Sequence, residues 1–155
     1  LFGLHATGLR FFTVYGPWGR PDMAPLLFSR AVLAGRPIEV FNEGRMQRDF
    51  THVSDIAAGI LGALHHPSTD AVPHRVFNLG NHTPVELERF IGVIEQAAGR
   101  PAQKVYKPMQ PGDMVRTMAD TRRAHDTFGF DAVIPIEEGL PPVVAWCRDY
   151  FGDRA

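Results

Sequence analysis

The sequence contains a single cysteine, Cys147, no long apolar run and no excess of either charge. One cysteine excludes an intrachain disulfide and a cysteine-based metal site, which favours a reducing, cytoplasmic setting. No stretch approaches the eighteen or so apolar residues of a membrane helix, so we expect neither a membrane partner nor a signal peptide. The formal net charge of -1 over 155 residues argues against non-specific binding of nucleic acid.

Motifs for metal binding, nucleophilic catalysis and phosphate loops are missing as well. The seven histidines have no metal-ligand spacing, and we therefore predict no metal site. No Ser/His/Asp order supports nucleophilic catalysis, no P-loop occurs, and the glycines form no GxGxxG pattern after a strand. Composition and spacing alone therefore indicate a globular α/β protein with a candidate anion site.

The most informative segment is LRFFTVYGPWGRPDM, residues 9–23. Its apolar, β-prone start predicts a buried strand over residues 9–14. Pro17 and Pro21 cannot lie in a central strand, so residues 16–22 are expected to form a loop. Because ligands bind at the strand ends of α/β sheets, this loop is a candidate binding segment.

Three polar residues of this segment allow two interpretations. Thr13 can be present for its β-propensity and Tyr15 as an amphipathic core residue, and the pattern alone favours that interpretation. Alternatively, both hydroxyls point into a crevice and bind a polar ligand. Arg10 is a charge inside an apolar strand, and an ion pair with a carboxylate is its expected role.

Strand and helix signals alternate along the rest of the chain. Apolar alternation predicts short strands over residues 37–41, 49–53, 75–79 and 103–107. Helical spacing predicts helices over residues 25–34, 54–64, 84–98, 120–128 and 136–150. Ser54 is expected to cap the second helix, and Thr83 with Glu86 to form a capping box for the third. The alternation predicts an α/β or α+β fold.

Charged residues beside the predicted turns are the remaining candidates for chemistry. Arg20 and Arg48 each follow or precede a turn, and two convergent arginines would suit a diphosphate. The alternative for Arg48 is a local ion pair with the adjacent Asp49. Asp113 lies in a tight turn, where it is either a solvated turn residue or an acceptor for a ligand hydroxyl.

Three blocks resemble hallmarks of the extended short-chain dehydrogenases/reductases. They are GLRFFTVYGP at residues 8–17, RDFTHVSDI at 48–56 and FNLGN at 77–81. Narrower motifs resemble the UDP-glucuronate 4-epimerase family, namely WGRPDMA at 18–24, PVEL at 84–87 and MQPGD at 109–113. The blocks occur in the family's order and cover the whole chain.

This resemblance implies an α/β fold that forms the C-terminal part of such an enzyme. Residues 1–155 would make one substrate-binding region, the small α/β domain, and residues 1–23 and 75–98 would complete the Rossmann sheet of an N-terminal domain. In that family NAD accepts a hydride from C4 of the sugar, and a Tyr-x-x-x-Lys pair supplies the base. Neither that pair nor the glycine-rich NAD loop occurs in the sequence. The resemblance therefore implies that both precede Leu1, that the chain holds no catalytic residue, and that the chain alone is inactive.

The resemblance also assigns residues to the sugar end of the substrate. Phe12 and Thr13 would lie beside the nicotinamide and the sugar, and Thr13 would bind the sugar carboxylate. Arg20 would contact the same end. A carboxylate held by Thr13 in an unfavourable orientation would lose CO₂ more slowly, which matters because a 4-keto uronic acid is a β-keto acid.

The nucleotide end receives the remaining assignments. The backbone from Glu39 to Phe41 would bracket the uracil, with the Phe41 ring against the base. Arg48 would bind the diphosphate and Gln47 would lie near the ribose. Asp113 would accept a hydrogen bond from a ribose hydroxyl.

The implied partners are a UDP-sugar, NAD bound mainly by the N-terminal half, and either that half or a second copy of the chain. The strands at residues 9–12 and 76–78 are accordingly expected to expose apolar faces. Two alternatives remain open from the sequence. One is a related epimerase or dehydratase for another nucleotide sugar, and the other is an inactive fragment that binds a nucleotide sugar.

Overall fold

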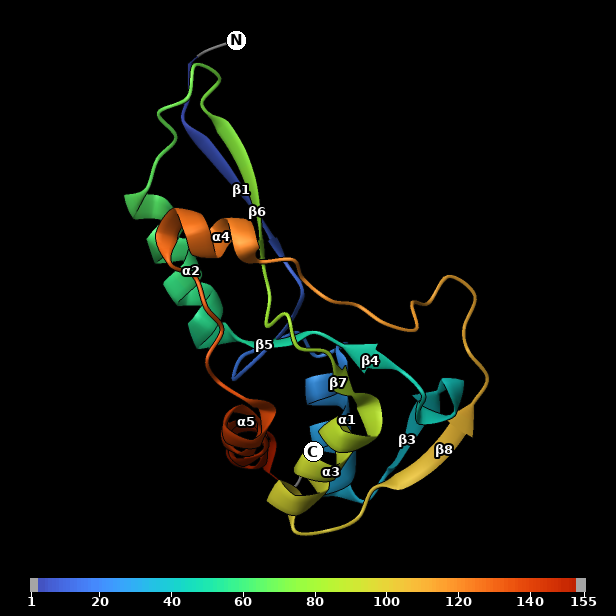
Figure 1. Ribbon diagram of the computed structural model, residues 1–155. Helices are drawn as coiled ribbons and strands as arrows, with labels where there is room; N and C mark the ends of the chain where they lie inside the picture. Colours follow the sequence, from blue (N-terminus) through green and yellow to red (C-terminus); the bar gives the residue numbers. More distant parts are fainter. Residues whose placement is uncertain (1–2, 153–155) are drawn as a thin grey trace.

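In the computed structural model, which describes residues 3–152, the chain forms two hydrophobic cores (Figure 1). The larger core lies among three helices and the strand β3. Its elements are α1 (Ala24–Ala34), β3 (Pro37–Phe41), α3 (Leu87–Ala98) and α5 (Ile136–Phe151). The smaller core lies where two helices meet a pair of strands. Its elements are β1 (Ala6–Phe11), α2 (Val53–His65), β6 (His74–Leu79) and α4 (Arg122–Phe128).

The strands pair two by two, and three of the four pairs are parallel. β1 runs parallel to β6, with Ala6 opposite His74 and Phe11 opposite Leu79. The other parallel pairs are β2 (Thr13–Tyr15) with β5 (Phe50–His52), and β3 with β8 (Gln103–Lys107). β4 (Gln47–Arg48) pairs antiparallel with β7 (Val85–Glu86). Figure 1 shows the short β4, β5 and β7 between the β1–β6 pair and the β3–β8 pair.

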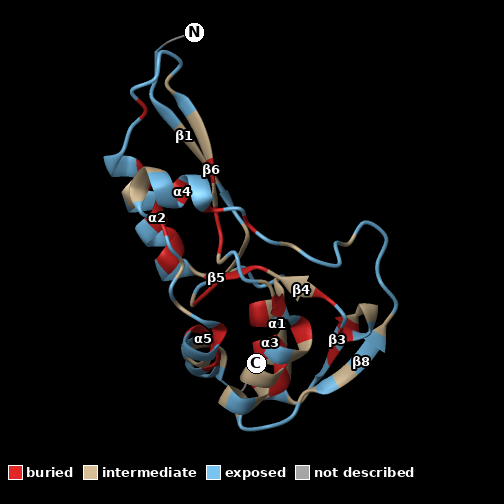
Figure 2. Cartoon of the chain, viewed as in Figure 1, coloured by how far each residue is buried: buried red, intermediate tan, exposed pale blue. Residues whose placement is uncertain are grey.

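The larger core is closed by α5, whose inner face is fully covered (Figure 2). Leu140 and Val143 have no exposed surface, and each such side chain contributes about 1.5–3 kcal/mol when it leaves water. Phe50 and Phe90 stack at 4.0 Å between ring centroids, which joins β5 to α3. This core therefore holds together segments that are forty to more than a hundred residues apart.

The interpretation of residues 9–14 as one buried strand is wrong. The strand breaks at Phe12, and no residue of β1 is buried. Phe11 is 47% exposed, because β1 has β6 as its only hydrogen-bonded neighbour among the described residues. The expected apolar exposure is thus found on β1, but not on β6, where Phe77 is buried against Phe128.

Two predicted helix caps are also wrong. His52, not Ser54, caps α2, since its ring Nδ1 accepts a hydrogen bond from the Ser54 amide. Thr83 makes no capping box, and α3 begins only after Glu86. The reason is tertiary: Val85 and Glu86 are held extended by their pairing with β4, so the helix cannot start earlier.

The other predicted elements are confirmed within one or two residues, and so is the α/β class. β3 and β8 have the predicted bounds. α1 ends where expected, at Gly35, whose φ of +67° is a conformation that glycine adopts at little cost. The structure has no helix within residues 3–152 that combines the length and apolar content needed to cross a bilayer.

Gly139 on α5 is required by the close approach of Tyr15. A Cβ at Gly139 would come within 2.9 Å of ring atoms of Tyr15, which is itself 2% exposed. We therefore expect Gly139→Ala to lower the free energy of unfolding by about 1–3 kcal/mol through overpacking, measured by urea denaturation.

Gly92→Ala is the matched control for this substitution. Gly92 also lies inside a helix, but a Cβ there would meet nothing within 4 Å. Removing a helical glycine should then stabilise the fold by about 0.5–1 kcal/mol. Equal effects of the two substitutions would contradict the proposed packing of Tyr15 on α5.

Candidate functional site

A pocket of about 330 Å³ opens where the loop after β2 meets α1, β3 and β4. This volume is within the range of small-molecule sites. Five of the residues assigned from the sequence line it: Thr13, Glu39, Phe41, Arg48 and Asp113. They come from segments up to a hundred residues apart, so the fold gathers them into one place.

The polar rim of the pocket is centred on Arg48. Its Nη2 donates to Oδ1 of Asp113 at 3.2 Å, and its Nη1 donates to the backbone oxygen of Met114 at 2.5 Å. The Arg48 side chain is 20% exposed and that of Asp113 33%. Nη1 also donates to the backbone oxygens of Gln47 at 3.1 Å and Val115 at 3.5 Å. Of the five N–H donors of the guanidinium, the Nε–H and one Nη2–H are then left for an anionic ligand.

The alternative for Arg48, a local ion pair with Asp49, is wrong. Asp49 is fully buried and faces away from the pocket. Its carboxylate accepts from the backbone amides of Asn81 at 2.6 Å, His82 at 3.1 Å and Ala119 at 2.8 Å. The Thr51 hydroxyl donates to it as a fourth partner, at 3.1 Å. Asp49 thereby joins the turn after β6 to the segment that follows the Asp113 turn.

The pocket is apolar at its floor. None of the residues that form this floor is assigned to a site from the sequence. The floor residues are Met23, Ala24, Phe28, Met46, Phe50 and Leu87. In the sequence these residues contribute only to the apolar periodicity of helices and strands, and that periodicity does not distinguish a pocket lining from a core.

The sequence paired Thr13 with Tyr15, and the structure separates them. Thr13 lines the pocket, whereas Tyr15 is buried and directs its hydroxyl to the backbone oxygen of Pro135 at 3.4 Å. Burial, together with the nearby Asp55 carboxylate, raises the pKa of Tyr15. The core interpretation is therefore confirmed for Tyr15.

Three assigned residues, Phe12, Arg20 and Gln47, lie outside the pocket lining. Arg20 is on the exposed loop and forms two hydrogen bonds with Asp22, at 3.1 and 2.5 Å. Hydrogen bonding by the Arg20 guanidinium lowers the pKa of the Asp22 carboxyl. Gln47 is in β4, where its amide and carbonyl bond the backbone of Val115 and Thr117, and its side chain lines a neighbouring hollow.

Phe12, the residue assigned to the nicotinamide, follows the carboxyl end of β1. Its amide donates to the backbone oxygen of Leu79 at 3.2 Å. Gly80 follows Leu79, so the ends of two parallel strands open at one edge, beside Thr13. Ligands of open α/β sheets bind at such edges.

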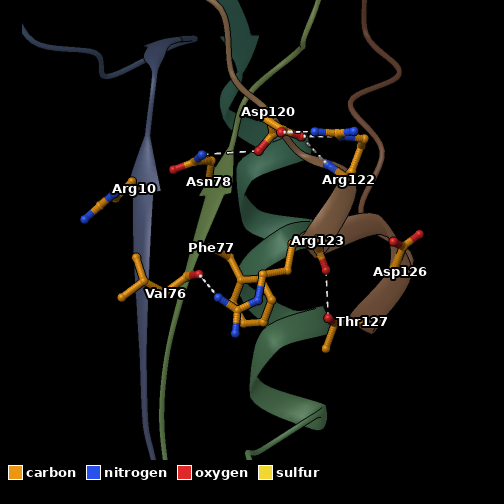
Figure 3. A pocket seen from close by; sticks show the side chains of 9 residues that line it. All are labelled: Arg10, Val76, Phe77, Asn78, Asp120, Arg122, Arg123, Asp126 and Thr127. Atoms are coloured by element: carbon orange, nitrogen blue, oxygen red, sulfur yellow. Dashed lines mark hydrogen bonds and ion pairs between the residues drawn. The ribbon is translucent and has the colours of Figure 1, made fainter.

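A larger cavity of about 630 Å³ lies between β6 and α4 (Figure 3). Its arginines do not converge on a shared point. Arg122 is paired with Asp120, whose pKa falls to about 2 through that hydrogen bonding. Arg123 lies over the Phe77 ring, and Figure 3 shows Arg10 pointing away from both of the other arginines. The ion pair expected for Arg10 is not formed with the carboxylates of this cavity.

Within residues 3–152, no group of three or more His, Cys, Asp or Glu residues is placed to hold a metal ion. Cys147 is buried, and burial raises the pKa of its thiol to about 11. The pocket around Arg48 is therefore the best-formed candidate site.

Comparison with known proteins points to one group of enzymes. The model of the NAD dependent epimerase/dehydratase family matches residues 1–80. A probable UDP-glucuronate 4-epimerase of Rhizobium meliloti is 42% identical over 94% of the chain, which corresponds to 47% of that protein. The chain spans about half the length of the curated relatives that it matches first.

Solved structures show the same relation. MoeE5, in complex with UDP-glucuronic acid and NAD, superposes with a TM-score of 0.85 at 35% identity, over 93% of this chain and 47% of MoeE5. UDP-glucuronic acid 4-epimerase from Bacillus cereus, also with UDP-glucuronic acid and NAD, gives 0.87 at 28% identity, over 96% and 47%.

The Asp49 contacts generate a stability prediction. Asp49→Asn replaces an acceptor of three amide hydrogens by a group that carries two N–H donors of its own. We expect the free energy of unfolding to fall by at least about 2–3 kcal/mol, because hydrogen bonds to a charged group are lost and buried amides are left unpaired. Urea denaturation measures the loss.

Asp131→Asn serves as the control, since that carboxylate is 56% exposed and its hydrogen bonds within residues 3–152 go to His125 alone. Its effect should stay within about 0.5 kcal/mol. A loss at Asp49 no larger than the one at Asp131 would contradict the anchoring role.

Proposed function

The chain belongs to the NAD dependent epimerase/dehydratase family, and on this premise we propose that it is the substrate-binding part of a UDP-sugar 4-epimerase that acts on UDP-glucuronate. The premise is supported by curated relatives at about 40% identity, two of which are a probable UDP-glucuronate 4-epimerase and UDP-glucuronate 4-epimerase 1 of Arabidopsis thaliana. The observation that carries the proposal is the pocket in which Arg48 and Asp113 meet Phe41.

In this proposal the nucleotide lies along the pocket from β3 to β4. Phe41 and the backbone beside Glu39 hold the uracil, and Asp113 accepts a hydrogen bond from a ribose hydroxyl. Arg48 uses its free donors for the diphosphate, since a guanidinium fork matches phosphate oxygens. Gln47 is adjacent to Arg48, but its side chain faces the neighbouring hollow, so it reaches the ribose only if it rotates.

The sugar end then points toward Thr13, at the edge where β1 and β6 end. When bound at this edge, NAD would supply the hydride acceptor and donor for C4 of the sugar. Phe12 and Thr13 would face the nicotinamide ring. Thr13 would also bind the sugar carboxylate and orient it so that the 4-keto intermediate keeps its CO₂, and Arg20 would approach the same carboxylate after leaving Asp22.

The proposal is tested by converting UDP-glucuronate with the full-length protein and following UDP-galacturonate by chromatography. UDP-glucose is the comparison substrate, because related epimerases act on it. We expect UDP-glucuronate to be preferred and the 155-residue chain alone to give no turnover, since its sequence contains no Tyr-x-x-x-Lys pair. Preference for UDP-glucose would contradict UDP-glucuronate as the substrate. Turnover by the 155-residue chain alone would contradict the proposal that the chain supplies substrate binding and no catalytic residue.

Arg48→Lys provides a site-directed prediction. Lysine keeps the charge but cannot form the two-pronged contact, so the Kd for UDP should rise by about 10- to 100-fold, the equivalent of one charged hydrogen-bonded contact. Isothermal titration calorimetry on the chain measures it.

Arg122→Lys makes the same chemical change at a site outside the pocket. Arg122 is 86% exposed and paired with Asp120, so the Kd for UDP should not change. If both variants bind UDP like the unsubstituted chain, Arg48 does not hold the diphosphate.

A further inference from the structure

An aromatic cluster on the surface joins the pocket loop to the last helix. We define it as Trp18, Trp146 and Tyr150. The Trp18 ring lies 5.2 Å from that of Trp146 and 5.1 Å from that of Tyr150, and the latter two stack at 5.1 Å. Trp18 belongs to the loop of residues 16–23, whereas its two partners belong to α5, more than 120 positions later.

The backbone at Trp18 is held in an unusual conformation. Its φ of +62° lies in the left-handed region, which a bulky residue seldom adopts and which costs free energy unless the surroundings enforce it. The residue is 73% exposed, so burial in the core does not enforce this conformation. The contacts with Trp146 and Tyr150 are therefore the interactions that hold Trp18 in place.

α5 offers a fixed support for this loop. Its inner residues are fully buried in the larger core, and its start holds Tyr15, the residue immediately before the loop. The loop is thus attached to α5 at two points, through Tyr15 against Gly139 and through Trp18 against Trp146. None of the α5 residues lines the pocket.

The loop ends in the residues that face the ligand site. Asp22 and Met23 line the pocket, and Arg20 is bonded to Asp22 at its rim. Gly19 is packed tightly between Trp18 and Arg20, since a Cβ there would lie 3.2 Å from the Gly16 carbonyl oxygen and 3.3 Å from Leu26. Gly19 alone separates Trp18 from Arg20, so a displacement of Trp18 is expected to move Arg20 as well.

We propose that Trp18 is a positioning residue, which fixes the loop of residues 16–23 on α5 and thereby places Arg20 for the sugar carboxylate. This inference rests on the proposed function and adds a residue that contacts no ligand. Asp22 and Met23 of the loop line the pocket, but the groups proposed to bind the nucleotide, Phe41, Arg48 and Asp113, lie outside the loop. Loosening the loop should therefore affect the charged sugar far more than the UDP portion.

The experiment compares Kd values of UDP and UDP-glucuronate by calorimetry on the chain. Trp18→Ala should raise the Kd for UDP-glucuronate by about 10-fold, because the loop must then be ordered on binding, and the Kd for UDP by less than about 2-fold. Trp18→Phe keeps a ring on α5 and should recover most of the affinity. Tyr150→Ala removes the support from the helix side and should act in the same direction as Trp18→Ala.

A structural readout accompanies the binding data. Trp18 and Trp146 are the only two tryptophans in the sequence, so near-ultraviolet circular dichroism reports their packing. The signal should fall in Trp18→Ala while the far-ultraviolet spectrum is unchanged. Val133→Ala is the control, because Val133 is 75% exposed outside the loop and α5, and it should alter neither Kd.

The other possible results of the calorimetry contradict either the positioning role or the proposed function. If the unsubstituted chain binds UDP-glucuronate and Trp18→Ala raises both Kd values equally or neither, the positioning role is wrong and the proposed function stands. If the unsubstituted chain binds neither nucleotide, the proposed function fails, and the positioning role fails with it.

Discussion

The buried carboxylate of Asp49 ties together three parts of the chain that are distant in sequence. It joins the β4–β5 segment, the turn after β6 and the segment before α4 through the amides of Asn81, His82 and Ala119. A buried carboxylate is stable only when such donors surround it, so the position of each part is specified by the others. Gly80 belongs to the same arrangement, since a side chain there would run into Ala119 and the Asp49 oxygens.

The pocket depends on this anchor through the alternation of side chains along an extended backbone. Arg48 and Phe50 face the pocket, while Asp49 and Thr51 face the opposite side and bond each other. The segment fastened at Ala119 is the same one that carries Asp113 toward Arg48. Residues 48–51 therefore supply both a ligand-facing surface and the hydrogen bonds that fix the position of that surface. α5 supports the other wall of the pocket in a comparable way, through Tyr15 and Trp18.

The sequence predicts helices and strands correctly where neighbouring residues alone determine where an element begins or ends. β3 and β8 have their predicted bounds, and α1 stops at Gly35, where a glycine adopts the left-handed conformation. The errors concern choices made by distant contacts. Thr83 has the residues of a capping box, but β4 holds Val85 extended and delays α3. The strand at residues 9–14 is apolar, but its burial depends on how many neighbours cover it.

The candidate site shows the same division. The sequence by itself determined which polar residues follow turns and strands, and motif resemblance to a family assigned roles to Thr13, Arg48 and Asp113. Only the tertiary structure decided that these three share one pocket, that Arg48 bonds Asp113 and not Asp49, and that Tyr15 turns into the core. The physical reason is that hydrogen bonds and packing between residues 30 to 120 positions apart are set by the meeting of whole elements, which no local pattern encodes.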